Sequence, residues 1–126
     1  MARRDLSGAV DFDYLESYAG GDLGLVEEVL GIFEQQCELW LRLLDPAGDP
    51  SVYRDGAHTM KGAAAGVGAR GLAEACGAAE AGAADDAGVR SVRLETIKTE
   101  LSAVLADISA WRHEQALRSL KGEGPI

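Results

Sequence analysis

The sequence has few aromatic residues, few prolines and only two cysteines. Aromatic side chains make up 6% of its 126 residues, and Ala and Leu dominate while Thr, Ile and Tyr are sparse. That mixture favours helices over strands. Cys37 and Cys76 are far apart, fall at apolar helical positions and form no C-x-x-C pair, so we expect buried, reduced thiols rather than a disulfide or a metal site.

Positive charge and long apolar runs are also scarce. Twelve Lys and Arg stand against 21 Asp and Glu, which gives a formal charge of -9 and a sequence pI of about 4.6. This sign disfavours nucleic acid and anionic membrane surfaces as partners. No segment reaches the roughly 18 to 20 apolar residues of a spanning helix, and Met1 to Asp5 leads into no apolar signal core. We expect a cytoplasmic protein.

Apolar residues recur at helical spacing through most of the chain. The clearest case follows Asp22, a predicted N-cap, and its two rows are Val26, Leu30, Phe33, Cys37, Trp40 and Leu44, and Leu25, Val29, Ile32, Leu39 and Leu43. The second row widens the stripe, as expected of a helix that contacts several neighbours. The Pro- and Gly-rich residues 45–50 then end this helix.

Further helices are predicted over residues 11–18, 51–66 and 69–83, and a final long one from about residue 91, with a small acidic loop at residues 82–88. The sequence therefore predicts one all-α domain over residues 11–118, an antiparallel up-down four-helix bundle with a short extra N-terminal helix at one end. The flanks, 1–10 and 119–126, are predicted to be flexible. Because four long helices can close a core within one chain, we expect a monomer.

The third predicted helix carries an unusual group of residues away from its apolar face. His58 is followed at three and four positions by Lys61 and Gly62, so both adjoin the imidazole on a helix. A glycine inside a helix costs about 1 kcal/mol relative to alanine, which suggests that Gly62 serves something other than helix stability. Thr59 and Ala65 add little bulk, so another protein could close over the ring.

This group suits phosphoryl transfer. An exposed imidazole has a pKa of about 6.5, so a neutral fraction with a nucleophilic ring nitrogen exists at cytoplasmic pH. Lys61 can then pair with phosphoryl oxygens, and Arg54, one turn before His58, extends a positive patch on an acidic protein. His113 lacks a following glycine and a flat neighbourhood, so it is the ordinary surface histidine of the chain.

The run His58-x-x-Lys61-Gly62, followed by Gly68-Ala69, Leu72 and a helix from Cys76 to Glu80, resembles the histidine phosphotransfer family. The resemblance extends over roughly residues 10 to 115. It implies that His58 accepts a phosphoryl group from a receiver-domain aspartate and passes it to another receiver, with Lys61 pairing with phosphate and Gly62 opening the surface. Positions 63 and 64 are Ala where many relatives carry a small hydroxyl residue.

The resemblance also implies a phosphocarrier rather than an enzyme with its own ATP site. Its partners would be receiver domains of response regulators or of a hybrid histidine kinase, and the receiver would supply Mg²⁺, since the chain needs no cofactor or metal of its own. The main alternative is a docking domain that binds receivers or a kinase without carrying phosphate.

Other classes of protein lack their motifs here. A di-iron bundle would need Glu-x-x-His on two helices, and a kinase or hydrolase would need a Walker loop or a nucleophile elbow. The sequence has none of these.

Overall fold

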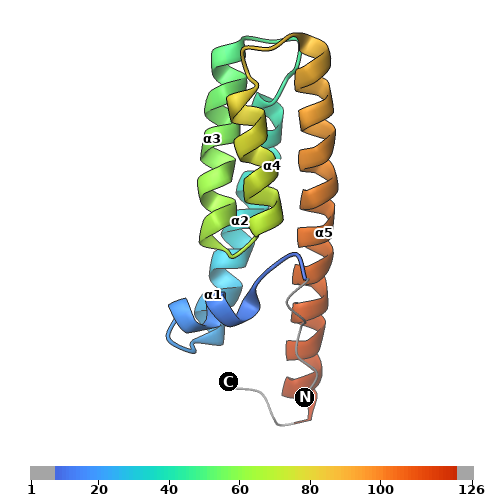
Figure 1. Cartoon of the computed structure of the whole chain (residues 1–126). Coiled ribbons are helices and arrows are strands. Elements are labelled where there is room, and N and C mark those ends of the chain that lie inside the picture. Colours follow the sequence, from blue (N-terminus) through green and yellow to red (C-terminus); the bar gives the residue numbers. More distant parts are fainter. Residues whose placement is uncertain (1–7, 122–126) are drawn as a thin grey trace.

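The computed structural model describes residues 8–121, and within this range the chain forms five helices and no strand (Figure 1). The helices are α1 (Phe12–Tyr18), α2 (Leu23–Leu43), α3 (Pro50–Gly66), α4 (Arg70–Ala81) and α5 (Ala87–Leu120). The prediction of an all-helical fold is confirmed. The outer parts of the two flanks predicted to be flexible, residues 1–7 and 122–126, lie outside the described residues.

The start of α5 differs most from the prediction. Asp86 caps this helix by accepting a hydrogen bond from the amide of Val89 at 3.0 Å, so α5 begins at Ala87 rather than near residue 91. The prediction was wrong because it assigned Gly88 to the loop, whereas a glycine is tolerated in the first turn of a well-capped helix. At the other end α5 continues to Leu120, beyond the predicted boundary at residue 118.

Helices α2 to α5 lie side by side, and the α2–α3 and α4–α5 loops meet at one end of the bundle while the α3–α4 turn lies at the other (Figure 1). The core between them is built from the apolar rows that the sequence shows. Its largest fully buried side chains are Tyr53, Phe12, Leu30, Leu44, Met60, Leu72, Ile97 and Ile108. These rows turn the polar face of α3 outward, which places His58 on the surface.

Arg90 joins the two loops at one end of the bundle, a role that the sequence analysis missed. Its guanidinium is buried and donates hydrogen bonds to the backbone carbonyls of Pro46, Ala83 and Asp85. The hydroxyl of Tyr53 in turn donates to the carbonyl of Arg90 at 2.8 Å. A buried charge is tolerated here because its donors are satisfied by carbonyls that the loops would otherwise leave unpaired.

Helix α1 packs across the opposite end of the bundle, as predicted. The ring of Phe12 stacks on Trp111 of α5 with centroids 5.7 Å apart, and the amide of Asp11 donates to the carbonyl of Gly68 at 3.0 Å. Gly68 has φ +78°, and a Cβ there would lie 3.0 Å from the backbone oxygen of Asp11. The tight α3–α4 turn therefore requires glycine at this position. Val10, which the prediction placed in the flexible flank, is buried beside these contacts.

The second apolar row of α2 does not widen the core stripe, contrary to expectation. Only Val26, Leu30, Phe33 and Cys37 of this helix are buried, whereas Val29 is half-buried and Leu25, Ile32, Leu39 and Leu43 are exposed. The expectation failed because periodicity reports which residues share a face and not which faces have a neighbour. One face of α2 is left apolar and open.

Candidate functional site

The candidate site lies on the outer face of α3, where His58 projects from the bundle. The side chain of His58 is 66% exposed, although the neighbouring residues Ala57 and Met60 are fully buried. Asp49 starts this helix by accepting a hydrogen bond from the amide of Ser51 at 2.8 Å. A capped helix with a buried inner face holds the backbone under His58 rigidly, so the ring starts from a fixed position.

One carboxylate joins the two residues that the sequence singled out. Oε2 of Glu80, on α4, lies 2.8 Å from Nδ1 of His58, and Oε1 of Glu80 lies 2.8 Å from Nζ of Lys61. Helices α3 and α4 pack closely along their length, and they bring together residues that are 22 positions apart. The structure thus places His58 and Lys61 in one hydrogen-bonded group with Glu80 at its centre.

Glu80 fixes which nitrogen of His58 faces outward. The ion pair with Lys61, and then the hydrogen bond with His58, lower the pKa of Glu80 below its ordinary value, so this side chain is a carboxylate at neutral pH. A carboxylate only accepts hydrogen bonds, so Nδ1 of His58 must carry the proton in this contact. In the neutral ring Nε2 then holds the lone pair, and it is the nitrogen free to act as a nucleophile.

Glu80 is the functional residue that sequence reasoning missed. The sequence analysis noted it only as the end of a matching helix, and the signal that could have found it is the antiparallel pairing of α3 with α4 through a short turn. That pairing sets residues from the middle of α3 beside residues late in α4. Its register depends on the turn at Gly68, which periodicity within one helix does not reveal.

The surface around the imidazole is open, as predicted. Gly62 is exposed, and a Cβ at this position would meet no atom within 4 Å, so nothing in the fold itself demands glycine there. Thr59 and Ala65 are also exposed. Ala65 borders a shallow hollow of 350 Å³ between α3, α4 and Tyr14 of α1. Small exposed residues therefore extend along α3 from His58 toward the hollow beside α1.

The predicted positive patch is weaker than the sequence suggested. Arg54 lies 3.4 Å from the carboxylate of its neighbour Asp55, and both side chains are exposed. Lys61 is held by Glu80. Each of these cations is thus balanced by a carboxylate, and an acidic partner would meet paired charges rather than bare positive charge.

The other candidate residues behave as ordinary structure. Cys37 and Cys76 are buried and free, and burial raises the pKa of each thiol to about 12, so both stay protonated and unreactive. His113 is exposed on α5 and has no hydrogen-bond partner among residues 8–121. In the same range, no group of three His, Cys, Asp or Glu side chains is arranged to hold a metal ion.

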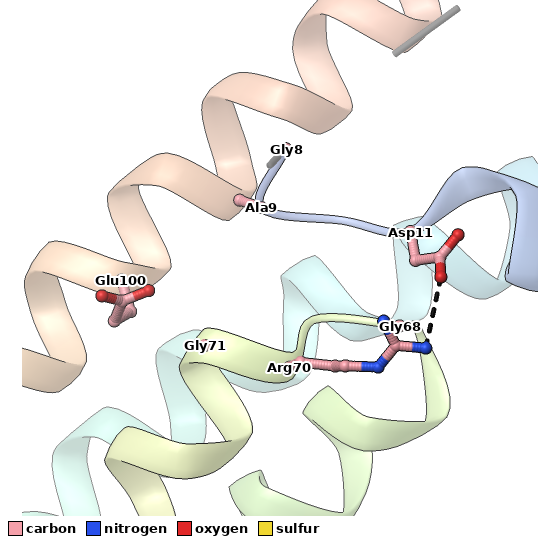
Figure 2. A pocket seen from close by; sticks show the side chains of 7 residues that line it. All are labelled: Gly8, Ala9, Asp11, Gly68, Arg70, Gly71 and Glu100. Atoms are coloured by element: carbon pink, nitrogen blue, oxygen red, sulfur yellow. Dashed lines mark ion pairs between the residues drawn. The ribbon is translucent and has the colours of Figure 1, made fainter. Parts of the chain in front are cut away.

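A second hollow, of 270 Å³, lies where α1, α4 and α5 approach one another (Figure 2). Arg70 lies alongside Asp11 there, with Nη2 3.3 Å from the carboxylate, while Glu100 stands apart on α5. Among the described residues that line the hollow, Arg70 is the only cation and it is already paired, and none of them is a Ser, Cys, His or Lys nucleophile. The residues suited to chemistry lie at His58 instead.

None of the helices in the described part of the chain has the length and apolar character needed to cross a membrane.

The fold and the site together define a helical carrier with one exposed, oriented histidine. Comparison with known proteins agrees: the family model described as Hpt domain matches residues 23–111. The chain is also similar to the crystal structure of histidine phosphotransferase ShpA from Caulobacter crescentus, with 50% sequence identity and a TM-score of 0.74 over 90% of this chain and 99% of that chain. Among curated proteins no match was found. The chain belongs to the histidine phosphotransfer domain family, as the residues around His58 predicted.

Proposed function

We propose that this chain accepts a phosphoryl group on Nε2 of His58 from the phosphorylated aspartate of a receiver domain and passes it to the aspartate of another receiver. The family supports a phosphotransfer role in a phosphorelay. The observation that carries the proposal is the hydrogen bond between His58 and Glu80, because it leaves Nε2 outermost and unprotonated on an exposed ring.

The transfer is a displacement at phosphorus. The Nε2 lone pair of His58 attacks the phosphorus of the aspartyl phosphate, the N–P bond forms, and the P–O bond to the aspartate breaks to release a carboxylate. The ring keeps its proton on Nδ1 and becomes positively charged. Glu80 stabilises that charge from 2.8 Å away, and the reverse reaction on a second receiver returns the ring to its neutral form.

Lys61 has a separate role in this proposal. In the free chain the ammonium of Lys61 is paired with Oε1 of Glu80. A rearrangement of the Lys61 side chain alone then brings it to a phosphoryl group on Nε2. When the phosphoryl group is bound to Nε2, the ammonium of Lys61 can pair either with the phosphoryl oxygens or with Oε1 of Glu80. Oε2 of Glu80 meanwhile keeps its hydrogen bond with His58. The lysine thereby pairs with the phosphoryl oxygens without releasing the ring orientation.

The remaining chemistry is assigned to the partner. The receiver supplies Mg²⁺ and the catalytic carboxylates, and this chain needs no cofactor and has no ATP-dependent kinase activity. The antiparallel up-down order of α2 to α5 is the frame that holds His58, and one copy suffices for transfer. Exposed Gly62, Thr59 and Ala65 contribute the docking surface around the ring, with Arg54 at its edge. The setting is the cytoplasm of a bacterium, where receivers and hybrid kinases meet.

Transfer of labelled phosphate from a phosphorylated receiver tests this function. We expect acid-labile label on the wild-type chain and on His113→Gln, none on His58→Gln, and none on any form with ATP alone. The alternative, a docking domain that carries no phosphate, predicts a different pattern. In that case several receivers bind the wild-type chain and His58→Gln equally, and neither form becomes labelled.

A further inference from the structure

Gly77 lies inside α4, where a glycine is unfavourable relative to alanine, so its presence has a cause in its surroundings. A Cβ at Gly77 would lie 3.5 Å from Cδ of Lys61, and among residues 8–121 this is the one atom of another helix within 4 Å. No backbone atom of α3 comes that close. Close approach of the two helix backbones therefore does not explain the glycine, whereas the side chain of Lys61 does.

The side chain of Lys61 crosses from α3 to α4 at this point. Gly77 and Glu80 are three residues apart and share a face of α4. The Cδ of Lys61 lies beside the space that a side chain of residue 77 would fill, and its Nζ lies 2.8 Å from Oε1 of Glu80. Only 41% of the lysine side chain is exposed. The apolar stem is thus partly covered while the ammonium contacts the carboxylate.

A larger residue at position 77 would compete with the lysine stem for this space. In a helix, side chains leave Cβ chiefly in two directions, with χ1 of about 180° or about −60°. Valine fills both directions with its two Cγ atoms, so it cannot turn away from Lys61. The lysine stem is part-exposed, and it would move outward into solvent instead.

We propose that Gly77 is a positioning residue for Lys61. The empty position on α4 admits the lysine stem, which brings the ammonium to Glu80, beside His58, instead of leaving it in solvent. A lysine side chain is flexible, so contact with α4 reduces the conformations open to the ammonium before a phosphoryl group is bound. The effect of Gly77 on transfer rests on the proposed function, whereas its effect on Lys61 and Glu80 in the unphosphorylated chain does not.

The carboxyl group of Glu80 reports where the ammonium lies, because Lys61 is the main cause of its lowered pKa and His58 is the other. Titration followed by ¹³C NMR of this carboxyl tests the proposal. We expect Gly77→Val and Lys61→Ala to raise its pKa equally toward the ordinary value. Gly77→Ala should keep it low, since a methyl group 3.5 Å from Cδ is in ordinary contact. Gly66→Val is the matched control on α3, where a Cβ meets no atom within 4 Å, and should titrate like wild type.

The double variant Lys61→Ala, Gly77→Val separates positioning from a role in α4 itself. With the stem removed, valine displaces nothing, so the double variant should titrate like Lys61→Ala. It should also be folded by circular dichroism, even if Gly77→Val alone is not. An unchanged pKa of Glu80 in Gly77→Val overturns the proposal, as does a further change in the double variant or a double variant that fails to fold.

The rate of transfer from a phosphorylated receiver is scored separately. It should fall in Gly77→Val as far as it falls in Lys61→Ala. If Lys61→Ala transfers at the wild-type rate, the role of Lys61 in the proposed function fails, and the titration of Glu80 still decides whether Gly77 positions the lysine.

Discussion

Glu80 lies 2.8 Å from Nδ1 of His58 and reaches it from the neighbouring helix. The same carboxylate pairs with Lys61, so in the proposed function it orients the nucleophile and also holds the cation that pairs with phosphate. Oriented imidazoles in proteins commonly owe their tautomer to such a partner on the other ring nitrogen. Several consequences of this relationship, and of the fold that creates it, are open to measurement.

Removing the carboxylate should slow phosphoryl transfer while leaving the acceptor in place. Glu80→Ala frees the ring to rotate and exchange tautomers, and we expect the rate of transfer from a phosphorylated receiver to fall about 10- to 100-fold. Glu80→Gln still accepts a hydrogen bond from Nδ1 through its amide oxygen, so its loss should be smaller. Rapid-quench kinetics measures both. Equal rates for wild type and Glu80→Ala would show that the orientation has no role.

The stability contributed by Glu80 should depend on pH. The pKa of Glu80 is lowered in the folded chain, chiefly by Lys61, so the folded state binds its proton less readily than the unfolded state. The contribution is therefore fully present above the ordinary glutamate pKa and is lost as the pH falls through the lowered value. Urea unfolding should show wild type more stable than Glu80→Gln at neutral pH, with the difference shrinking as the pH falls below the ordinary glutamate pKa and through the lowered one. A difference that grows in acid would contradict this sign.

Gly62 should be a site where stability and function oppose one another. A Cβ there meets no atom within 4 Å, so Gly62→Ala should stabilise the chain by about 0.5 to 1 kcal/mol through helix propensity. The added methyl group stands one turn beyond His58, where the proposed function has a receiver close over the ring, and should slow transfer. Gly56→Ala is the contrasting variant, because its Cβ would lie 2.9 Å from Cβ of Leu43. Gly56→Ala should lower the stability of the chain. If Gly62→Ala is stabilised but transfers phosphate at the wild-type rate, Gly62 has no role in transfer.

Arg90 should be among the most important residues for stability although it lies far from the site chemistry. Arg90→Met leaves the carbonyls of Pro46, Ala83 and Asp85 without their donor, and we expect a loss of about 2 to 4 kcal/mol. Arg93→Met, an exposed position on the same helix, is the control and should change little. Thermal and urea unfolding give the comparison. Similar losses in both variants would show that the loop contacts are not what Arg90 contributes.

The sequence was sufficient for the parts of this molecule that depend on contacts within one helix. Spacing along α3 placed His58, Lys61 and Gly62 together on an exposed face, as the structure has them. It did not find Glu80, since that contact depends on how α3 and α4 align across a glycine turn. Nor did it find Arg90, whose partners are loop carbonyls with no side-chain signature.

The same limit explains the error on α2. The row containing Ile32 is as regular as the row that is buried, so periodicity alone could not tell them apart. Which row faces the core depends on the directions from which α3 and α5 approach. Arg112 of α5, for instance, pairs with Glu27 and Glu34 on the opposite flank of α2 from Ile32. Only the packed helices show that Ile32 remains exposed.

The most direct test of the account is the identity of the phosphorylated atom. The chain, labelled with ¹⁵N at histidine, is incubated with a phosphorylated receiver, and the ring nitrogens are observed by NMR. We expect one phosphohistidine, His58, with the phosphoryl group on Nε2 and the proton retained on Nδ1 facing Glu80. A phosphoryl group on Nδ1 of His58, or on His113, would contradict it.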